Sequence, residues 1–399
     1  MSSSTVAVPD GAASARRGGI NLPILALAIG AFGIGVTEFA PMGLLPLIAQ
    51  DLRVSVPVAG MLVTAYAVGV MLGAPVMTLT TSHWQRKRLL IAMMGIFTIG
   101  NLMSALADSY EMLLVARLVT SLNHGAFFGV GSIVAAGVVA PHRRAGAVAA
   151  MFMGLTIANV VGVPLAAWVG ELLGWRTAFA GVTVLGVATM IALALALPNV
   201  GRGEGVDARA ELKALTRPDV LVALLVTMLQ SGAMFAGFTY IAPILRDVTH
   251  ATPAFVSAML VLYGLGLTLG NWAGGRSADK SIQRTLVVGL VSLVAIMLVL
   301  AVAMHWAWAI APTIFLWGVA TFWMVPPLQL RVMEAAKDAP NLASATNIGA
   351  FNMGNALGAA VGGGVIALGL GYPMVAVSGA ALAGLALVVV LIAARMRGA

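Results

Sequence analysis

The chain has 399 residues, of which 60% are hydrophobic and only 9% are charged, and its mean hydropathy is +1.00. Because soluble domains carry about 25% charged residues, this composition excludes an ordinary soluble protein and indicates an integral membrane protein. The absence of cysteine excludes disulfides, thiolate metal sites and cysteine nucleophiles. The net charge of +8 comes from short basic clusters between apolar runs, which is typical of membrane topology signals and not of a nucleic-acid-binding patch.

Twelve apolar segments are each long enough to cross a bilayer as a helix, which takes about 20 residues. In chain order they cover residues 20–47, 57–80, 89–107, 110–139, 146–169, 175–198, 219–245, 254–275, 285–304, 306–330, 343–369 and 372–394. The first run continues well past the length of a cleavable signal peptide, so we expect it to remain as the first span. The sequence therefore predicts an all-α membrane protein with twelve transmembrane helices.

Lys and Arg predict the orientation of these spans, because cytoplasmic loops of membrane proteins carry an excess of basic residues. With the N-terminus inside, eighteen of the twenty-two Lys and Arg fall in inner segments. The outer loops hold only Arg53, Arg176 and Arg246. We therefore expect both termini in the cytoplasm.

A shift of 197 residues superposes the two halves of the sequence. It aligns Pro46 with Pro243, Tyr66 with Tyr263, Gly69 with Gly266 and Gly73 with Gly270. Two six-span repeats of the same orientation follow, and we expect a bundle over 1–198, a polar cytoplasmic linker over 199–218 and a second bundle over 219–399. Such parallel bundles suggest alternating access, in which the halves rock around a site near the midplane.

Glu38 is the only charged residue between Arg17 and Asp51, inside the first predicted span. On insertion scales, an acidic residue at the centre of a membrane helix raises the free energy of insertion by roughly 2.5–3.5 kcal/mol. Such a residue therefore usually faces a polar pathway. It lies about 14 Å from the outer end of its span, and Arg117 of span 4 lies about 11 Å from the same face. His124 follows Arg117 by two helical turns on nearly the same face.

We hypothesise that Glu38 is the principal proton carrier. Arg117 would stabilise its charged form in one state, and separation or substrate binding would favour the protonated form in another. His124 would relay protons or hydrogen-bond a substrate, because histidine changes charge near neutral pH. The alternatives are a static Glu38–Arg117 pair that fixes helix packing, an architectural Arg117 that binds helix-end carbonyls, and a structural His124.

Three segments carry a family resemblance: Gly35-Val-Thr-Glu38-Phe-Ala-Pro41-Met-Gly43, Arg117 through His124-Gly125-Ala-Phe-Phe-Gly129, and Asn159-Val-Val-Gly162-Val-Pro164-Leu. Together they make the chain similar, over nearly all of its length, to the major facilitator superfamily. Within it the chain resembles the twelve-span drug:proton antiporters, especially arabinose efflux permeases and chloramphenicol efflux transporters. The resemblance implies a monomer of the bacterial inner membrane without a cofactor. Its implied partners are a small-molecule substrate, protons and the lipid bilayer, and not nucleic acid.

In this family the loop between spans 2 and 3 and its repeat in the second half form a cytoplasmic gate. The resemblance assigns this role to Gly73, Arg86, Lys87, Arg88, Gly275, Arg276 and Asp279. Ser82 and Gln85 stand where the first loop of the family has Asp and Gly. We therefore expect a weaker charge relay in the first half.

The family arrangement also implies a substrate cavity lined by spans 1, 4, 7 and 10, with contributions from spans 2, 5, 8 and 11. Its candidate lining residues are Thr37, Met42, Tyr66, Asn123, Asn159, Gln230, Phe235, Tyr240, Tyr263, Trp323, Asn352 and Asn355. So few charges suit a neutral or moderately apolar ligand with hydroxyl or amide groups. Each residue singly would more often serve helix packing. Pro326-Pro327 interrupt helical bonding in span 10 and predict a hinge, a cavity wall or a simple kink.

These observations predict a proton-coupled antiporter that exports a small neutral or moderately apolar solute, such as a chloramphenicol-like drug or a sugar. A proton symporter that imports a nutrient is the alternative, and architecture alone does not separate the two. An enzyme with a metal site is disfavoured, since the five histidines are scattered along the chain. No Gly-x-x-x-x-Gly-Lys-Ser/Thr motif is present for an ATP-driven pump. A channel fits the half-chain repeat less well, and no extramembrane segment is long enough for a sensor.

Overall fold

The computed structural model describes residues 21–81, 84–140, 144–198, 216–336 and 340–398. Its elements are α1 (Leu22–Asp51), α2 (Val56–Thr81), α3 (Arg86–Ala105), α4 (Tyr110–Ser121), α5 (His124–Gly137), α6 (Arg144–Ile157), η2 (Ala158–Gly162), α7 (Val163–Leu173), α8 (Trp175–Ala196), α10 (Pro218–Phe238), α11 (Ile241–Pro243), η3 (Ile244–Val248), α12 (Pro253–Ala278), α13 (Ile282–Ala303), α14 (Ala307–Trp323), α15 (Val325–Ala335), α16 (Pro340–Ala367) and α17 (Tyr372–Gly398). All elements in this described part are helices, which confirms the predicted all-α membrane fold. Most of the predicted linker 199–218 and Ser82 lie outside the described residues.

Eleven helical segments in the described ranges are long and apolar enough to cross a membrane. They coincide with eleven of the twelve predicted spans. The remaining predicted span, 343–369, coincides with α16, a helix of 28 residues. Asn347, Asn352 and Asn355 lower the hydropathy of α16. The chain is therefore a multi-pass membrane protein.

Four predicted spans are not continuous α-helices. Span 4 breaks at 122–123, span 10 breaks at Met324, span 5 contains the π-helical turn η2, and span 7 is interrupted at 239–240 before α11 and η3. Proline accounts for three of these irregularities, because it lacks the N–H that would bond the carbonyl four residues earlier. The carbonyls left by Pro164, Pro243 and Pro326 lie in or beside the irregular turns. The expected interruption of span 10 is thus a break just before its two prolines.

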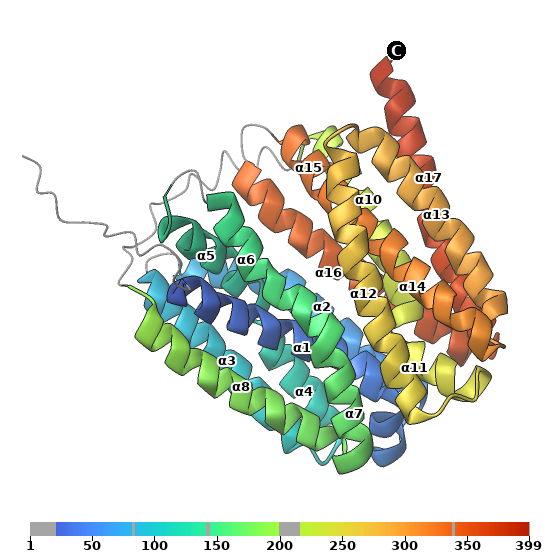
Figure 1. Ribbon diagram of the computed structural model, residues 1–399, viewed down its shortest axis with the longest axis horizontal. Helices are drawn as coiled ribbons and strands as arrows, with labels where there is room; N and C mark the ends of the chain where they lie inside the picture. The colour runs from blue at the N-terminus through green and yellow to red at the C-terminus, as the bar shows by residue number, and fades with distance from the viewer. Residues whose placement is uncertain (1–20, 82–83, 141–143, 199–215, 337–339, 399) are drawn as a thin grey trace, which may run out of the picture.

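The helices gather into a first half, α1 to α8, and a second half, α10 to α17. Figure 1 shows the first half at the lower left, in blue to green, and most of the second half at the right, in yellow to red. In the first half α3 packs on α8, and α1 packs on α6 and α8. In the second half α10 packs on α16 and α17, and α12 packs on α14. Each half thus has a helical core of its own.

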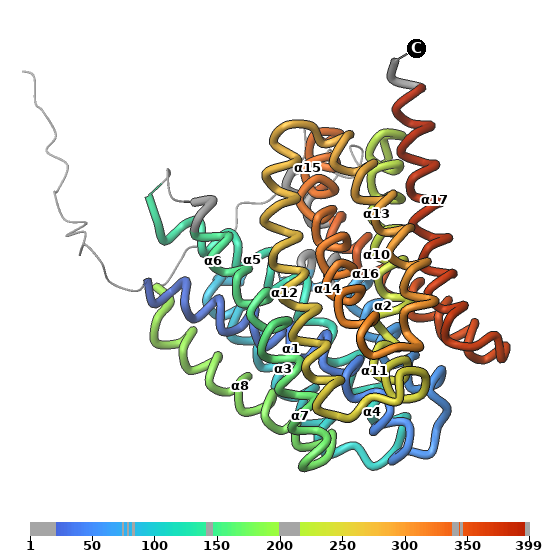
Figure 2. The backbone as a smooth tube through the Cα atoms, turned by 45° about the vertical axis from the view of Figure 1, so that its right-hand side comes forward, coloured from blue at the N-terminus to red at the C-terminus, as the bar shows by residue number. Residues whose placement is uncertain are grey.

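We name the two ends of the molecule after residues that lie there: the Asp51 end, where α1 finishes, and the Arg86 end, where α3 begins. Between the halves, α2 contacts α16, α1 contacts α11, and η2 and α7 contact α12. At the Asp51 end Arg246 of η3 pairs with Glu171 of α7, and Tyr240 packs against Gly60. Figure 2 shows α4, α7 and α11 gathered at this end, at the bottom of the view. These named contacts join the halves towards the Asp51 end.

Gly154 of α6 lies against the backbone of α1, where a Cβ atom would collide with the carbonyl oxygen of Ala28. We expect Gly154→Ala to lower the apparent Tm of the detergent-purified protein by several degrees, because overpacking of this kind costs about 1–3 kcal/mol. Gly181→Ala is the matched control, since a Cβ atom there meets no other atom within 4 Å. Equal melting temperatures for the two variants would contradict this packing.

Candidate functional site

Glu38 lies in α1 and is only 6% exposed. Among the described residues it is the only acidic side chain that is buried. Its Oε2 lies 3.9 Å from Nδ1 of His124, and its Oε1 accepts a hydrogen bond from Nδ2 of Asn355 at 3.4 Å. The carboxyl group is therefore held between α1, α5 and α16. Partners of this kind are what a buried carboxylate needs, because burial of an unpaired charge is strongly unfavourable.

Arg117 of α4 binds the backbone of α1 one residue before Glu38. Its Nη1 donates to the carbonyl oxygen of Thr37 at 2.7 Å, and its guanidinium carbon lies 4.2 Å from the centre of the Tyr66 ring. No ion pair joins Arg117 to Glu38 in the part of the chain that the structure describes. The guanidinium is held instead by a carbonyl oxygen and an aromatic ring, so this arrangement is not the static Glu38–Arg117 pair that was the alternative. Arg117 fixes the main chain that carries Glu38 and places a positive charge beside it.

His124 begins α5 directly after the break in span 4. Its Nδ1 lies 3.1 Å from the hydroxyl oxygen of Tyr66 as well as 3.9 Å from the carboxyl group of Glu38. The hydroxyl donates to Nδ1 or accepts from it, according to the tautomer of His124. A small rearrangement would bring the imidazole and the carboxyl group within hydrogen-bonding distance.

Two further polar residues extend these contacts on either side. Oγ1 of Thr37 donates to Oδ1 of Asn101 in α3 at 2.5 Å, and Oγ of Ser231 in α10 donates to Oδ1 of Asn355 at 2.5 Å. Neither Asn101 nor Ser231 was predicted from the sequence. The available signal was a polar residue within an apolar helix. Asn101 was not chosen because span 3 lies outside the family's cavity, and Ser231 was not chosen because small residues are common at helix-packing contacts. We call the following residues, all of them buried, the polar network: Asn101, Thr37, Arg117, Tyr66, His124, Glu38, Asn355 and Ser231.

A buried aromatic cluster adjoins the polar network between the halves. The ring of Phe39 lies 6.0 Å from that of Phe235 and 6.1 Å from that of Phe238. Phe238 stacks on Tyr263 at 4.5 Å, and Tyr263 lies 4.9 Å from Trp317. Phe235 and Tyr263 were predicted as substrate contacts. The other three were missed, because an aromatic residue in an apolar span cannot be told from core by sequence.

Four predicted amide residues are buried but stand apart from the polar network. Gln230 donates to the carbonyl oxygen of Thr321 at 3.1 Å. Asn159 and Asn352 donate to carbonyl oxygens of their own helices at 3.0 Å. The side-chain amide of Asn123 has no hydrogen-bond partner within the described ranges. A buried amide without a partner costs free energy, so Asn123 keeps its place as a candidate ligand contact.

Met42 and Tyr240 pack where the two halves meet. Met42 is buried in the core that α1 shares with the second half. Tyr240 lies at the Asp51 end, where its hydroxyl donates to the carbonyl oxygen of Ala359 at 2.8 Å. Within the described ranges neither residue hydrogen-bonds to the polar network, and their packing points to closure of this end.

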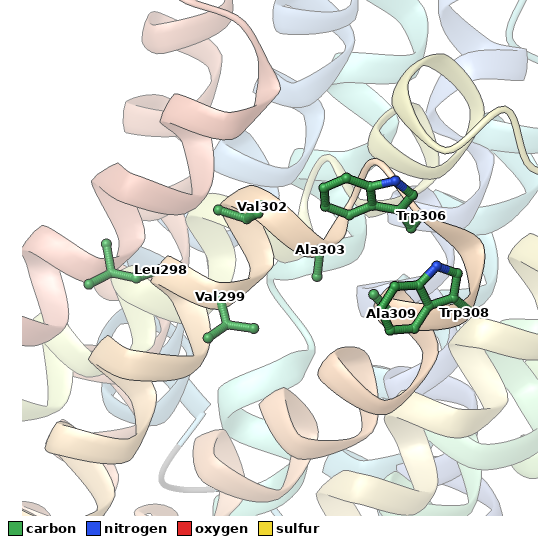
Figure 3. Close-up of a pocket in the computed structure, with 7 residues that line it drawn as sticks. All are labelled: Leu298, Val299, Val302, Ala303, Trp306, Trp308 and Ala309. Carbon is green, nitrogen blue, oxygen red and sulfur yellow. The ribbon is translucent and has the colours of Figure 1, made fainter.

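Trp323 is predicted to line the substrate cavity, and that role stays a prediction. It borders a groove of about 250 Å³ between α13 and α14, together with the exposed residues Val288 and Leu316. A second groove of about 590 Å³ lies between the same two helices near the Asp51 end, with Trp306 and Trp308 at its edge (Figure 3). Its seven lining residues are all apolar or tryptophan. Such surfaces suit contact with lipid and lack the converging polar groups of a solute site.

Three of the predicted gating residues, Gly73, Lys87 and Arg276, contact residues of their own half. Lys87 lies with Arg86 and Arg88 in the first turn of α3, and its Nζ donates to the carbonyl oxygen of Leu197 at 2.7 Å. Gly73 of α2 packs on Leu122. Arg276 lies over the ring of Trp272 at 4.1 Å, and Gly275 and Asp279 are close to it at the end of α12. A gating role for these residues stays a prediction.

The family model described as Major Facilitator Superfamily matches residues 27–363. The chain belongs to the major facilitator superfamily. It is a membrane transporter, as the geometry of two helical halves around a buried polar network suggests.

Relatives of this major facilitator transporter share nearly its whole length. The inner membrane transport protein YdhP of Escherichia coli (strain K12) is 57% identical over 94% of this chain and 97% of its own. A probable sugar efflux transporter of Helicobacter pylori (strain ATCC 700392 / 26695) is 32% identical over 88% of this chain and 90% of its own. A chloramphenicol resistance protein of Streptomyces lividans is 32% identical over 84% of this chain and 87% of its own.

A solved structure also shares the fold of this transporter. It is that of a bacterial homologue of the human lysosomal transporter Spinster, with a TM-score of 0.69 at 16% identity. The match covers 94% of this chain and 95% of the other. At this identity the likeness establishes the fold alone.

The two contacts of Tyr66 can be separated by substitution. Tyr66→Phe removes the hydroxyl that faces His124 but keeps the ring that Arg117 covers, whereas Tyr66→Leu removes both. We expect the apparent Tm to fall slightly in Tyr66→Phe and further in Tyr66→Leu, because a desolvated cation–π contact contributes about 2 kcal/mol. Thermal unfolding of the purified variants measures this order. An equal loss in both would contradict the role given to the Arg117–Tyr66 contact.

Proposed function

We propose that this transporter is a proton-coupled antiporter that exports a small neutral or moderately apolar solute by alternating access, with Glu38 as the proton carrier. The observation that carries the proposal is the position of Glu38. Its buried carboxyl group contacts His124 of the first half and Asn355 of the second. A charge at this position acts on both halves at once, so its neutralisation by a proton changes the contact between them.

The surroundings of Glu38 support two protonation states. Arg117 and the amide of Asn355 favour the ionised carboxylate, while burial favours the neutral acid. Because no other acidic side chain in the described ranges is buried, Glu38 is the natural carrier. The five-residue aromatic cluster and the unpartnered amide of Asn123 offer stacking surfaces and hydrogen bonds to a solute. Relatives named for sugar efflux and chloramphenicol resistance support export of such a solute.

We further propose that the Arg86 end faces the cytoplasm, with both chain termini there. Arg86, Lys87 and Arg88 lie at this end, whereas Arg176 and Arg246 at the Asp51 end are paired with Asp51 and Glu171. The described arrangement, joined towards the Asp51 end, then corresponds to the state that faces the cytoplasm. Residues 1–198 and 219–399 would be the two moving halves of a monomer, linked by 199–218.

Glu38→Gln tests the proton-carrier role. We expect this variant to fold with an unchanged elution volume in detergent but to lose transport driven by a pH gradient, because glutamine cannot bind and release a proton. Chloramphenicol, pentose and nucleoside probes are assayed in liposomes, and the rate should fall to that of protein-free liposomes. Glu111→Gln, which replaces an exposed acid in α4, is the matched control with unchanged transport. A probe that Glu38→Gln moves at the wild-type rate, with the same pH response, would refute the proposal.

The orientation is tested directly because the chain has no cysteine of its own. Single substitutions Asp108→Cys and Lys280→Cys place a thiol at exposed sites of the Asp51 end and the Arg86 end, respectively. A membrane-impermeant maleimide added to spheroplasts should label the first and not the second until the membrane is permeabilised. Labelling of Lys280→Cys alone in sealed cells would reverse the orientation.

A further inference from the structure

The carboxyl group of Glu38 takes part in a hydrogen bond that crosses between the halves. Nδ2 of Asn355 in α16 donates to Oε1 of Glu38 in α1 at 3.4 Å. The Glu171–Arg246 pair at the Asp51 end is another polar side-chain contact between the halves. The Glu38–Asn355 hydrogen bond therefore joins the two halves directly at the carboxyl group of Glu38.

Ser231 supports the orientation of the Asn355 amide that the structure shows. Its hydroxyl donates to Oδ1 of Asn355 at 2.5 Å, and a carbonyl oxygen can only accept. The NH₂ group of Asn355 must then point at Glu38, and an amide NH₂ can only donate. Asn355 in this orientation binds an ionised carboxylate more strongly than a protonated one, because hydrogen bonds to charged groups are about twice as strong as neutral ones. Ser231 and Asn355 are both buried, at 3% and 5% exposure, so water competes little for these bonds.

We propose that Asn355, oriented by Ser231, is a positioning residue that locks the empty, deprotonated carrier in the arrangement closed at the Asp51 end. This inference rests on the proposed proton-carrier role of Glu38. An antiporter must forbid one step, the change of state with neither proton nor substrate bound, because that step dissipates the gradient. The Glu38–Asn355 bond is strongest in that form and weakens when Glu38 binds a proton.

The same geometry specifies how a substrate would release the lock. A solute that donates a hydrogen bond to the Glu38 carboxylate replaces Asn355 there and frees α16 from α1. This requires a hydroxyl or amide N–H on the solute. The substrate class is therefore a neutral molecule with at least one such donor next to an apolar surface that fits the aromatic cluster.

The lock is tested by the accessibility of one introduced cysteine. Ala59 of α2 is fully buried in the core shared by the halves at the Asp51 end, so Ala59→Cys reports opening of that end. The protein in nanodiscs is labelled with N-ethylmaleimide at pH 8 without substrate. Every variant is labelled at this one pH, so that the intrinsic reactivity of the thiol does not differ between measurements. We expect Asn355→Leu to raise the labelling rate about tenfold, the effect of losing one charge-assisted hydrogen bond. Ser231→Ala should raise it less, because the amide can then turn away.

Matched variants separate the lock from general loosening. Thr227→Val removes a buried hydroxyl one turn before Ser231 that bonds only to its own helix, at Ala223, and should leave the rate unchanged. Glu38→Gln should also raise the rate, because its neutral amide oxygen accepts a weaker bond from Asn355, and the double variant should be no faster than Asn355→Leu, since both changes act on the same bond. The proposal is overturned if the effects of Glu38→Gln and Asn355→Leu on the labelling rate are additive. It is also overturned if Thr227→Val has the same effect as Ser231→Ala, or if neither Asn355→Leu nor Ser231→Ala changes the rate.

The two proposals fail in different ways. If substitution of Asn355 and Ser231 leaves the labelling rate of Ala59→Cys unchanged while Glu38→Gln still abolishes pH-driven flux, the lock is wrong and the proton-carrier role stands. If Glu38→Gln leaves pH-driven flux intact, the proton-carrier role is wrong whatever the labelling shows.

Discussion

Burial of the Glu38 carboxyl group between two sets of helices is the constraint around which the other contacts are organised. An ionised group with so little access to water needs donors and a nearby positive charge. Arg117 supplies the charge and also binds the α1 backbone at Thr37, so the helix that carries the acid is fixed by the residue that compensates it. Asn355 supplies the donor from the other half. Stability of the packing and the response to protons thus depend on the same bonds.

The two sequence repeats have diverged at equivalent positions. Tyr66 and Tyr263, aligned by the 197-residue shift, are both buried. Tyr66 lies under the guanidinium of Arg117 and faces His124, whereas Tyr263 stacks on Phe238 beside Trp317. Within the polar network the first half holds Glu38, His124 and Arg117, whereas four of the five residues of the aromatic cluster lie in the second half. This division suits a mechanism in which protons act on one half and the solute rests largely on the other.

Much of this arrangement follows from the sequence, because long apolar runs, basic loops and a lone intramembrane acid are strong local signals. Glu38, Arg117 and His124 were singled out on that basis and lie together. The direct Glu38–Arg117 pair was not found, since helix depth gives proximity but not which acceptor a guanidinium selects. Trp323 borders a groove between α13 and α14, and periodicity does not say which face of a broken helix points inward. Asn101 and Ser231 matter only through partners distant in sequence, at 64 and 124 residues, which no local pattern reveals.

The central claim, that a proton on Glu38 controls closure between the halves, is tested most directly by a distance across the Asp51 end. Asp108 and Ala254 are both exposed. Spin labels on the double variant Asp108→Cys/Ala254→Cys report this distance in nanodiscs by pulsed electron paramagnetic resonance. We expect a short distance at high pH, a population at longer distance at low pH, and the longer population at both pH values in Glu38→Gln. A pH-dependent shift that persists unchanged in Glu38→Gln would contradict it.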